Sequence, residues 1–310
     1  MYKNVILESQ KNFYKMETVS TLESLDTNTL KLLLKDAMDK KRDIAQGDFL
    51  KFVKEVWPDF IEGKHHKIYA EKLNRIANGE LKRLIVNMPP RHTKSEFASN
   101  LFPAFYMGRH PKAKLIQTTH NGELAIRFGR KAKNMIESSE YEKVFPTVTL
   151  AADSKAAGRW ESNHGGEYFA AGVGGAITGR GADLLIIDDP HSEQDALSPT
   201  VLDSHYEWYT SGPRQRLQPG GSIVLVMTRW STKDLTGRLL EAQGKDPAAD
   251  QWEVVEFPAI LNDKPMWGGF WTMDGLQGVK ASIPLTKWQA QWMQQPTSEE
   301  GAIIKREWWR

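Results

Sequence analysis

The chain has 310 residues, which is enough to bury one large hydrophobic core or two smaller ones. Its 41 basic and 39 acidic side chains almost balance, so any contact with nucleic acid must come from a local patch rather than from an overall positive field. Cysteine is absent, which excludes disulfides and thiolate metal sites, and we find neither a signal peptide nor an apolar run that could span a membrane, so we expect a cytoplasmic protein that is not secreted.

Three helices are predicted ahead of the first strand, because apolar residues recur there at helical spacing. We expect residues 1–80 to form a helical region that packs on the core, and residues 1–25 to be poorly ordered. The three predicted helices, with the residues that would start or stop them, are 27–44 after a cap at Asp26 or Thr27, 49–57 before Pro58, and 65–79 ending at Gly79.

The stretch Leu84–Glu96 begins as an apolar run, breaks at two prolines and then opens a helical pattern. This order of strand, tight loop and helix is typical of a phosphate-binding loop, whose backbone N–H groups surround an anion. Lys94 would supply a charge to the β- and γ-phosphates, and Ser95 a hydroxyl to Mg²⁺. The usual pattern is G-x-x-x-x-G-K-[ST], and Met88 and Thr93 replace its glycines. A proline turn followed by a solvated lysine therefore fits this stretch equally well.

A second, acidic strand decides between these readings. Four consecutive aliphatic residues, Leu184–Ile187, predict a strand buried on both faces, as in a parallel sheet. Asp188 and Asp189 follow at its carboxyl end, where open α/β sheets bind ligands. Because adjacent side chains on a strand point to opposite sides, one carboxylate could hold Mg²⁺ while the other polarises a water molecule. The alternative is an Asp-Asp-Pro turn after a core strand.

The other predicted elements alternate between strands and helices, which favours crossover connections and a layered α/β fold. We expect residues 261–284 to be a long loop or a small lid, and 295–301 to be a linker. The predicted strands are 114–119, 147–151, 167–171, 222–228 and 252–257, and the predicted helices are 122–136, 199–209, 234–242 and 286–294.

Two further segments are candidates for contact with DNA. Residues 171–181 contain five glycines, and such a segment can let backbone approach a ligand closely or can be a flexible connection too mobile for the core. Its one charge, Arg180, could contact a phosphate. Arg127, Arg130 and Lys131 share one face of a predicted helix, where a plain solvated face is favoured over a DNA-binding stripe.

Three motifs in this order resemble the ATPase half of the tailed-bacteriophage terminase large subunits. They are Met88–Glu96, Thr178–Pro190 and Met227–Trp230, and the resemblance covers about residues 45–310. It implies an ATPase with ATP and Mg²⁺ as cofactors, which drives viral double-stranded DNA into a procapsid in the host cytoplasm. The implied partners are this DNA, the portal protein of the procapsid, the terminase small subunit and further copies of the chain in a ring, with a monomer possible in isolation and no membrane.

The resemblance also implies the fold. We expect an α/β P-loop NTPase core of the ASCE/RecA-like type over residues 81–260, with three layers, a mostly parallel central sheet, a helical N-terminal cover and a small C-terminal lid. In the family a nuclease domain of the RNase H type follows. Residues 261–310 are expected to be the lid and a linker toward that domain, which is absent here, so nuclease activity is not expected.

Site roles follow from the resemblance as well. Ser95 and Asp188 would hold Mg²⁺, and Asp189 would orient the attacking water. Most relatives have glutamate in that place, so Glu193 is a possible substitute. Thr228 would sense the γ-phosphate or is simply a threonine that ends a strand. The residues expected to contact the nucleotide are Pro90, Arg91, His92, Thr93, Lys94, Ser95, Glu96 and Thr228. Either one of His65 and His66 packs on the adenine, or both are surface histidines near a helix start.

Arg91 is the first candidate for an arginine finger, a residue that stabilises the charge of the transition state in its own subunit or in a neighbour. Arg180, Arg229 and Arg238 are the alternatives.

Two other functions use the same motifs. A helicase or remodelling ATPase would need a second RecA-like domain, for which this length leaves little room, and a nucleotide-gated assembly subunit would bind ATP without hydrolysing it.

Overall fold

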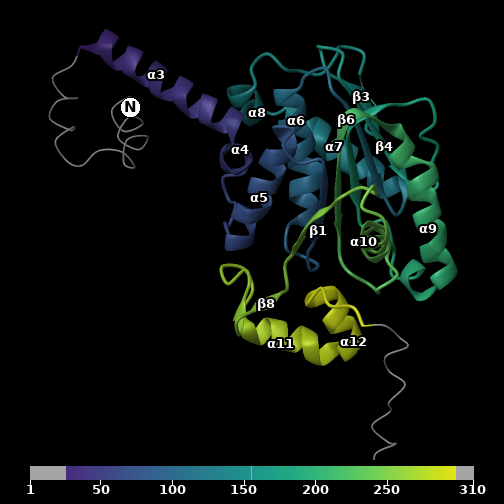
Figure 1. Ribbon diagram of the computed structural model, residues 1–310. Helices are drawn as coiled ribbons and strands as arrows, with labels where there is room; N and C mark the ends of the chain where they lie inside the picture. Colours follow the sequence, from purple (N-terminus) through teal and green to yellow (C-terminus); the bar gives the residue numbers. More distant parts are fainter. Residues whose placement is uncertain (1–25, 155, 298–310) are drawn as a thin grey trace, which may run out of the picture.

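The computed structural model describes residues 26–154 and 156–297 (Figure 1). The predictions for residues 1–25, and for the part of the linker beyond residue 297, lie outside the described residues. No helix within the described ranges combines the length and the apolar character needed to cross a membrane.

A seven-stranded sheet forms the centre of the fold, in the order β3-β4-β2-β5-β6-β1-β7. Its strands run parallel to their neighbours except for β3, which is antiparallel to β4 at the edge. The predicted mostly parallel sheet is therefore confirmed. The strands are β1 (Arg83–Asn87), β2 (Lys114–Thr119), β3 (Arg159–Glu161), β4 (Glu167–Gly172), β5 (Ala182–Asp188), β6 (Leu217–Met227) and β7 (Glu253–Glu256).

Helices cover both faces of the sheet, which gives the three predicted layers (Figure 1). Alternate strand residues face alternate layers, so Leu84 and Val86 of β1 join one core cluster while Ile85 joins the other. The first cluster includes side chains of α4 (Phe49–Val56), α5 (Lys64–Ala77), α6 (Phe102–Arg109), α7 (Gly122–Ile136) and α8 (Ser139–Val144), and the second includes side chains of α9 (Pro199–Ser211) and α10 (Leu235–Lys245).

The N-terminal helices agree with the prediction. Helix α3 (Thr27–Gly47) is capped by the Asp26 carboxylate, which accepts hydrogen bonds from two backbone N–H groups of its first turn. Only Ala45 of this helix is buried, and Figure 1 shows α3 extending away from the body of the protein. The helices α4 and α5 pack against the phenylalanine-rich core on the same side of the sheet.

One local prediction is wrong. The strand expected at 147–151 is absent apart from one bridge between Leu150 and Ser162, and the edge strand is β3 instead. Trp160 of β3 stacks on Tyr168, its direct partner in β4, with ring centres 4.6 Å apart, and this cross-strand contact favours β3 as the edge strand. The helix expected after Ser95 is present, and its first part, Glu96–Leu101, is a π-helix that continues into α6.

The glycine-rich segment links β4 to β5 without a helix. Ile177 within it is buried and the guanidinium of Arg180 lies 3.9 Å from the centre of the Phe169 ring, so the segment packs on the sheet more closely than expected. Gly172, at the end of β4, passes the start of α7 so closely that a Cβ would lie 2.5 Å from the Gly122 nitrogen. Only glycine fits at that position.

The region from 260 onward has more structure than the predicted loop. A short hairpin of β8 (Ile260–Leu261) and β9 (Lys264–Pro265) precedes α11 (Met273–Ser282). Neither the hairpin nor the helix was predicted from the sequence. Helix α12 (Leu285–Lys287) continues into a π-helix, Trp288–Trp292. These elements enclose a separate small core around Leu276 and two tryptophans, and we call residues 260–297 the lid (yellow-green and yellow in Figure 1).

Candidate active site

The loop from Met88 to Ser95 follows β1 directly and has a strained backbone. Thr93 has a φ of 69° and Arg91 a φ of 60°, a region that favours glycine. The usual loop pattern has glycine where Thr93 stands, and glycine adopts such a φ without strain. A β-branched residue there costs on the order of 1–3 kcal/mol.

Hydrogen bonds of the Thr93 side chain offset this strain. The Thr93 hydroxyl donates to the His92 carbonyl oxygen at 2.5 Å and lies 2.7 Å from Nε2 of His66 on α5. Because Nδ1 of His66 accepts a hydrogen bond from the Gly63 N–H at 2.8 Å, its proton sits on Nε2, which donates to the Thr93 hydroxyl. Helix α5 therefore holds the loop in place.

Replacing Thr93 with valine should test this arrangement. Valine keeps the β-branch and its strain but removes the hydroxyl, which leaves the His66 donor buried without an acceptor. We expect the free energy of unfolding to fall by about 1–3 kcal/mol. Thr93→Ser keeps the hydroxyl and should be as stable as the wild type in the same urea titration. A Thr93→Val protein as stable as Thr93→Ser would show that these hydrogen bonds do not support the loop.

The two carboxylates at the end of β5 have separate partners. Asp188 is fully buried, and its Oδ1 accepts a hydrogen bond from the Ser95 hydroxyl at 2.9 Å. Asp189 forms an ion pair with Lys94, whose Nζ lies 2.7 Å from Oδ2, and its Oδ1 accepts from the Thr228 N–H at 2.8 Å. The structure therefore brings together the lysine and serine of the loop, both carboxylates and the end of β6.

Burial and charge act against each other in this cluster. Burial, followed by repulsion from Asp189, raises the pKa of Asp188 to about 7, although Lys94 and the serine hydroxyls oppose the rise. Burial alone would lower the pKa of the Lys94 ammonium, but the carboxylates of Asp189 and Asp188 outweigh it and the pKa is raised. The buried Lys94 is therefore a cation, paired with the carboxylate at the end of the acidic strand.

Three histidines and the lid tryptophans surround the other side of the loop. His92 stacks on Trp271 with ring centres 5.8 Å apart, and His66 meets Trp267 edge-on at 5.0 Å. His65 and His66 are 1% and 0% exposed, so the reading of them as surface histidines is wrong. Trp267 covers both rings, and packing of adenine on either one stays a prediction. The sequence shows these tryptophans, but nothing in it predicts that they contact the loop.

Burial in this cluster keeps the histidines neutral. It lowers the pKa of His65 to about 3, of His66 to about 2 and of His92 to about 4. The unfolded chain would bind these protons near pH 6.5. The unfolded state therefore holds more protons below pH 6.5, and the stability contributed by the neutral histidines is complete above that pH and is lost as the pH falls toward about 4 for His92, about 3 for His65 and about 2 for His66.

We therefore expect the unfolding free energy to fall as the pH drops from 6.5 to 4, by up to ~1.4 kcal/mol per pH unit for each histidine. Denaturant titrations over this range would measure it. His65→Phe should flatten the dependence, whereas His164→Gln, at an exposed histidine, should leave it unchanged. An equal slope in His65→Phe and the wild type would contradict the assignment.

Two predicted site residues are engaged elsewhere. The Glu96 carboxylate lies 3.1 Å from Lys131 of α7 and accepts a hydrogen bond from Asn100 at 2.7 Å. Glu193 is exposed and pairs with Lys287 of the lid at 2.9 Å. Among the described residues, no hydrogen bond or ion pair joins Glu193 to the loop or to the two aspartates. Pro90 stays within the loop, where its carbonyl oxygen accepts from Nδ1 of His92 at 2.7 Å.

The four candidate arginines differ in their contacts. Arg229 is 7% exposed and locked by Asp234, with Nε and a carboxylate oxygen 3.0 Å apart. Arg238 pairs with Asp203 at 2.8 Å, and Arg180 stacks on Phe169. Arg91 is exposed, and across residues 26–154 and 156–297 its side chain has no hydrogen bond, ion pair or ring contact.

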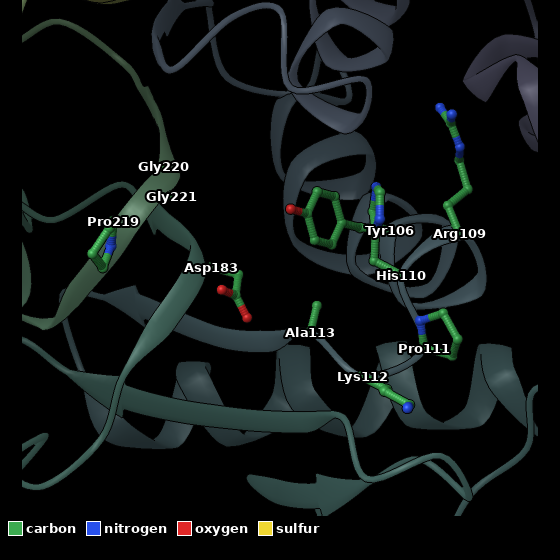
Figure 2. A pocket seen from close by; sticks show the side chains of 10 residues that line it. All are labelled: Tyr106, Arg109, His110, Pro111, Lys112, Ala113, Asp183, Pro219, Gly220 and Gly221. Atoms are coloured by element: carbon green, nitrogen blue, oxygen red, sulfur yellow. The ribbon is translucent and has the colours of Figure 1, made fainter.

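A cavity of about 550 Å³ lies at the other end of the strands, where β2 and β5 begin. The Tyr106 hydroxyl points into it from α6, and the Asp183 carboxylate lies near it at the start of β5 (Figure 2). Its polar groups are largely used internally, since Asp183 accepts from the Lys114 N–H at 2.8 Å and Arg109 donates to Asn78 at 2.8 Å. The cavity contains no residue of the loop or of the acidic pair, so it is separate from the candidate active site.

The sheet order defines the class of the fold. One strand, β6, lies between β1, which leads into the loop, and β5, which carries the carboxylates. This arrangement, with helices on both faces, is that of a P-loop ASCE core.

Comparison with known proteins agrees with that class. No family model matches the sequence, and no curated protein matches it. The crystal structure of the HK97 bacteriophage large terminase is similar to this chain with a TM-score of 0.50 and 14% identity, over 76% of this chain and 51% of that one. An ATPase-domain mutant of the Thermus phage P74-26 large terminase is similar with a TM-score of 0.44 and 15% identity, over 68% of this chain and 88% of that one. The chain therefore has the fold seen in a phage large terminase, and it spans about half the length of the HK97 protein.

Proposed function

We propose that this chain is a Mg²⁺-dependent ATPase and the motor domain of a phage terminase large subunit, which drives double-stranded DNA into a procapsid. The meeting of Lys94 and Ser95 with Asp188 and Asp189, at 2.7 and 2.9 Å, carries the ATPase part of the proposal. The likeness in fold to the HK97 large terminase supports the packaging part. Assembly into a ring and contacts with a portal protein and a small subunit are further parts of this proposal.

The acidic strand end suits a magnesium ion. A carboxylate and a hydroxyl are the hard oxygen ligands that Mg²⁺ prefers, and Asp188 and Ser95 present them side by side. A bound Mg²⁺ would neutralise charge on the β- and γ-phosphates. The burial that raises the pKa of Asp188 also means that this carboxylate has little water to lose when it meets a cation.

The ion pair of Lys94 with Asp189 suggests how the site responds to a nucleotide. A phosphate in the loop competes with Asp189 for the Lys94 ammonium, because both are anions within its reach. When Lys94 turns to the phosphate, Oδ2 of Asp189 is released to orient a water molecule, while Oδ1 stays on the Thr228 N–H. Thr228 is then a support for Asp189 at the end of β6.

Steady-state phosphate release by the purified chain, with and without double-stranded DNA, tests the proposal. Asp188→Asn should lose Mg²⁺-dependent nucleotide binding, because an amide is a poorer ligand for the cation. Asp189→Asn should bind ATP but turn it over on the order of 10²-fold more slowly. Asp274→Asn, at an exposed position on α11, is the matched control and should behave as the wild type.

Three outcomes would change the proposal. Equal loss of nucleotide binding in both variants would mean that the two carboxylates do not have separate roles. Normal turnover in Asp189→Asn would transfer the water-orienting role to another group, with Glu193 to be examined next. Nucleotide binding without any phosphate release would indicate the nucleotide-gated assembly subunit instead.

A further inference from the structure

Asp188 has a second hydroxyl partner that the sequence motifs do not contain. Ser99 is fully buried on the π-helix Glu96–Leu101, and its Oγ donates to Oδ2 of Asp188 at 2.5 Å. Ser95 takes the other carboxylate oxygen, Oδ1. One buried carboxylate therefore receives a hydrogen bond on each oxygen, from two serines one helical turn apart.

This contact is unusual for a serine within a helix. Such a hydroxyl commonly bonds back to a carbonyl oxygen of the preceding turn. Ser99 instead reaches a side chain on β5, 89 positions along the chain. The surrounding helix is firmly seated, since Phe97, Ala98 and Leu101 are buried in the core. The hydroxyl of Ser99 is therefore a fixed donor aimed at Asp188.

Two donors restrain a carboxylate more than one does. A single hydrogen bond leaves the carboxylate free to rotate about its Cβ–Cγ bond, whereas bonds to both oxygens hold its plane. Each hydroxyl has one proton, and Ser95 commits its proton to Asp188, which leaves its oxygen lone pairs available to a cation. Because Ser99 holds Oδ2, the carboxylate of Asp188 keeps a fixed orientation relative to the hydroxyl of Ser95.

We propose that Ser99 is a positioning residue for the divalent cation, which holds Asp188 in register with Ser95 without touching the nucleotide. This inference rests on the proposed function, because it assumes that Asp188 and Ser95 receive Mg²⁺ with ATP. Partners that orient a metal ligand in this way typically contribute 10–100-fold, as an order of magnitude, to metal affinity. Loss of Ser99 should therefore weaken the response to Mg²⁺ selectively.

The test measures binding of a fluorescent ATP analogue, N-methylanthraniloyl-ATP, to the full chain, first with EDTA and then during a Mg²⁺ titration. Ser99→Ala should need roughly 10–100 times more Mg²⁺ for the half-maximal effect, with unchanged affinity in EDTA. Ser99→Thr keeps the hydroxyl and should restore the wild-type Mg²⁺ requirement. Ser222→Ala is the matched control, because Ser222 is also buried but donates to the Leu81 carbonyl oxygen away from the site.

A role in packing alone would give a different result. It would lower thermal stability, or weaken nucleotide binding equally with and without Mg²⁺, and either pattern with an unchanged Mg²⁺ requirement overturns the inference. If Ser99→Ala does not fold, Ser99→Cys replaces it, since a thiol fills the space but is a weak donor and should show the same Mg²⁺ shift. Wild-type protein that binds no nucleotide would refute the proposed function and this inference together, whereas Mg²⁺-dependent binding that is identical in Ser99→Ala refutes the inference alone.

Discussion

Replacing Lys94 with alanine is expected to lower kcat/KM for ATP hydrolysis by about 10⁴-fold, close to complete loss. A charge-assisted contact contributes on the order of 1.5–3 kcal/mol to binding, and a donor aimed at developing charge contributes on the order of 10²–10³ in kcat. Lys94 is buried, and its Nζ lies 2.7 Å from Asp189 at the end of the acidic strand.

The fold should survive this change, because the side chain of Asp189 is 27% exposed and water can solvate it once its partner is gone. Circular dichroism and thermal melting would confirm that. Lys40→Ala, which removes an exposed lysine paired with Asp36 on α3, is the control and should hydrolyse ATP at the normal rate. Wild-type turnover in Lys94→Ala would mean that the loop does not bind phosphate.

Arg91→Ala should slow turnover by ~10³–10⁵ with little change in ATP affinity, as expected for an arginine finger. Arg91 lies in the loop beside the site, and its guanidinium is exposed without a side-chain partner in the described part of the chain. Arg229 and Arg238 are held by Asp234 and Asp203, so they would have to break ion pairs before they could reach a phosphate.

A finger that acts on a neighbouring subunit predicts specific activity that rises with protein concentration. It also predicts that Lys94→Ala protein, which is inactive but still carries Arg91, restores activity to Arg91→Ala protein. A finger that acts within its own subunit predicts neither effect. Arg238→Ala serves as the comparison, and turnover that is unaffected by Arg91→Ala would remove this residue from the mechanism.

The sequence predicts those parts of the fold that local patterns decide. The aliphatic runs of β1, β2 and β5 are strands because their residues are buried on both faces, and Asp26 and Asn121 cap the helices that were expected after them. The edge strand β3 was not predicted because it has only three residues, Arg159–Glu161, and depends on the cross-strand stacking of Trp160 on Tyr168. Local periodicity contains no information about such a contact.

The same distinction applies to the site. The sequence predicts that Lys94, Ser95 and the two aspartates lie close together, because strand ends of a parallel sheet converge on one edge, and the structure brings these side chains together. Ser99 was missed because its contact depends on how the helix packs on β5. The closeness of His92 to Trp271 depends on folding that brings together residues 179 positions apart in the chain. The partner of Glu193 was equally unpredictable, since Lys287 comes from the lid.

The stacking of His92 on Trp271 has a practical consequence. An indole reports on its surroundings through its fluorescence, and here one lies 5.8 Å from an imidazole of the loop. A shift of the loop of even an ångström would change the quenching of that indole. The arrival of a ligand could therefore be followed in the unlabelled protein by its own emission, and Trp271→Phe would identify the share of the signal that comes from this ring.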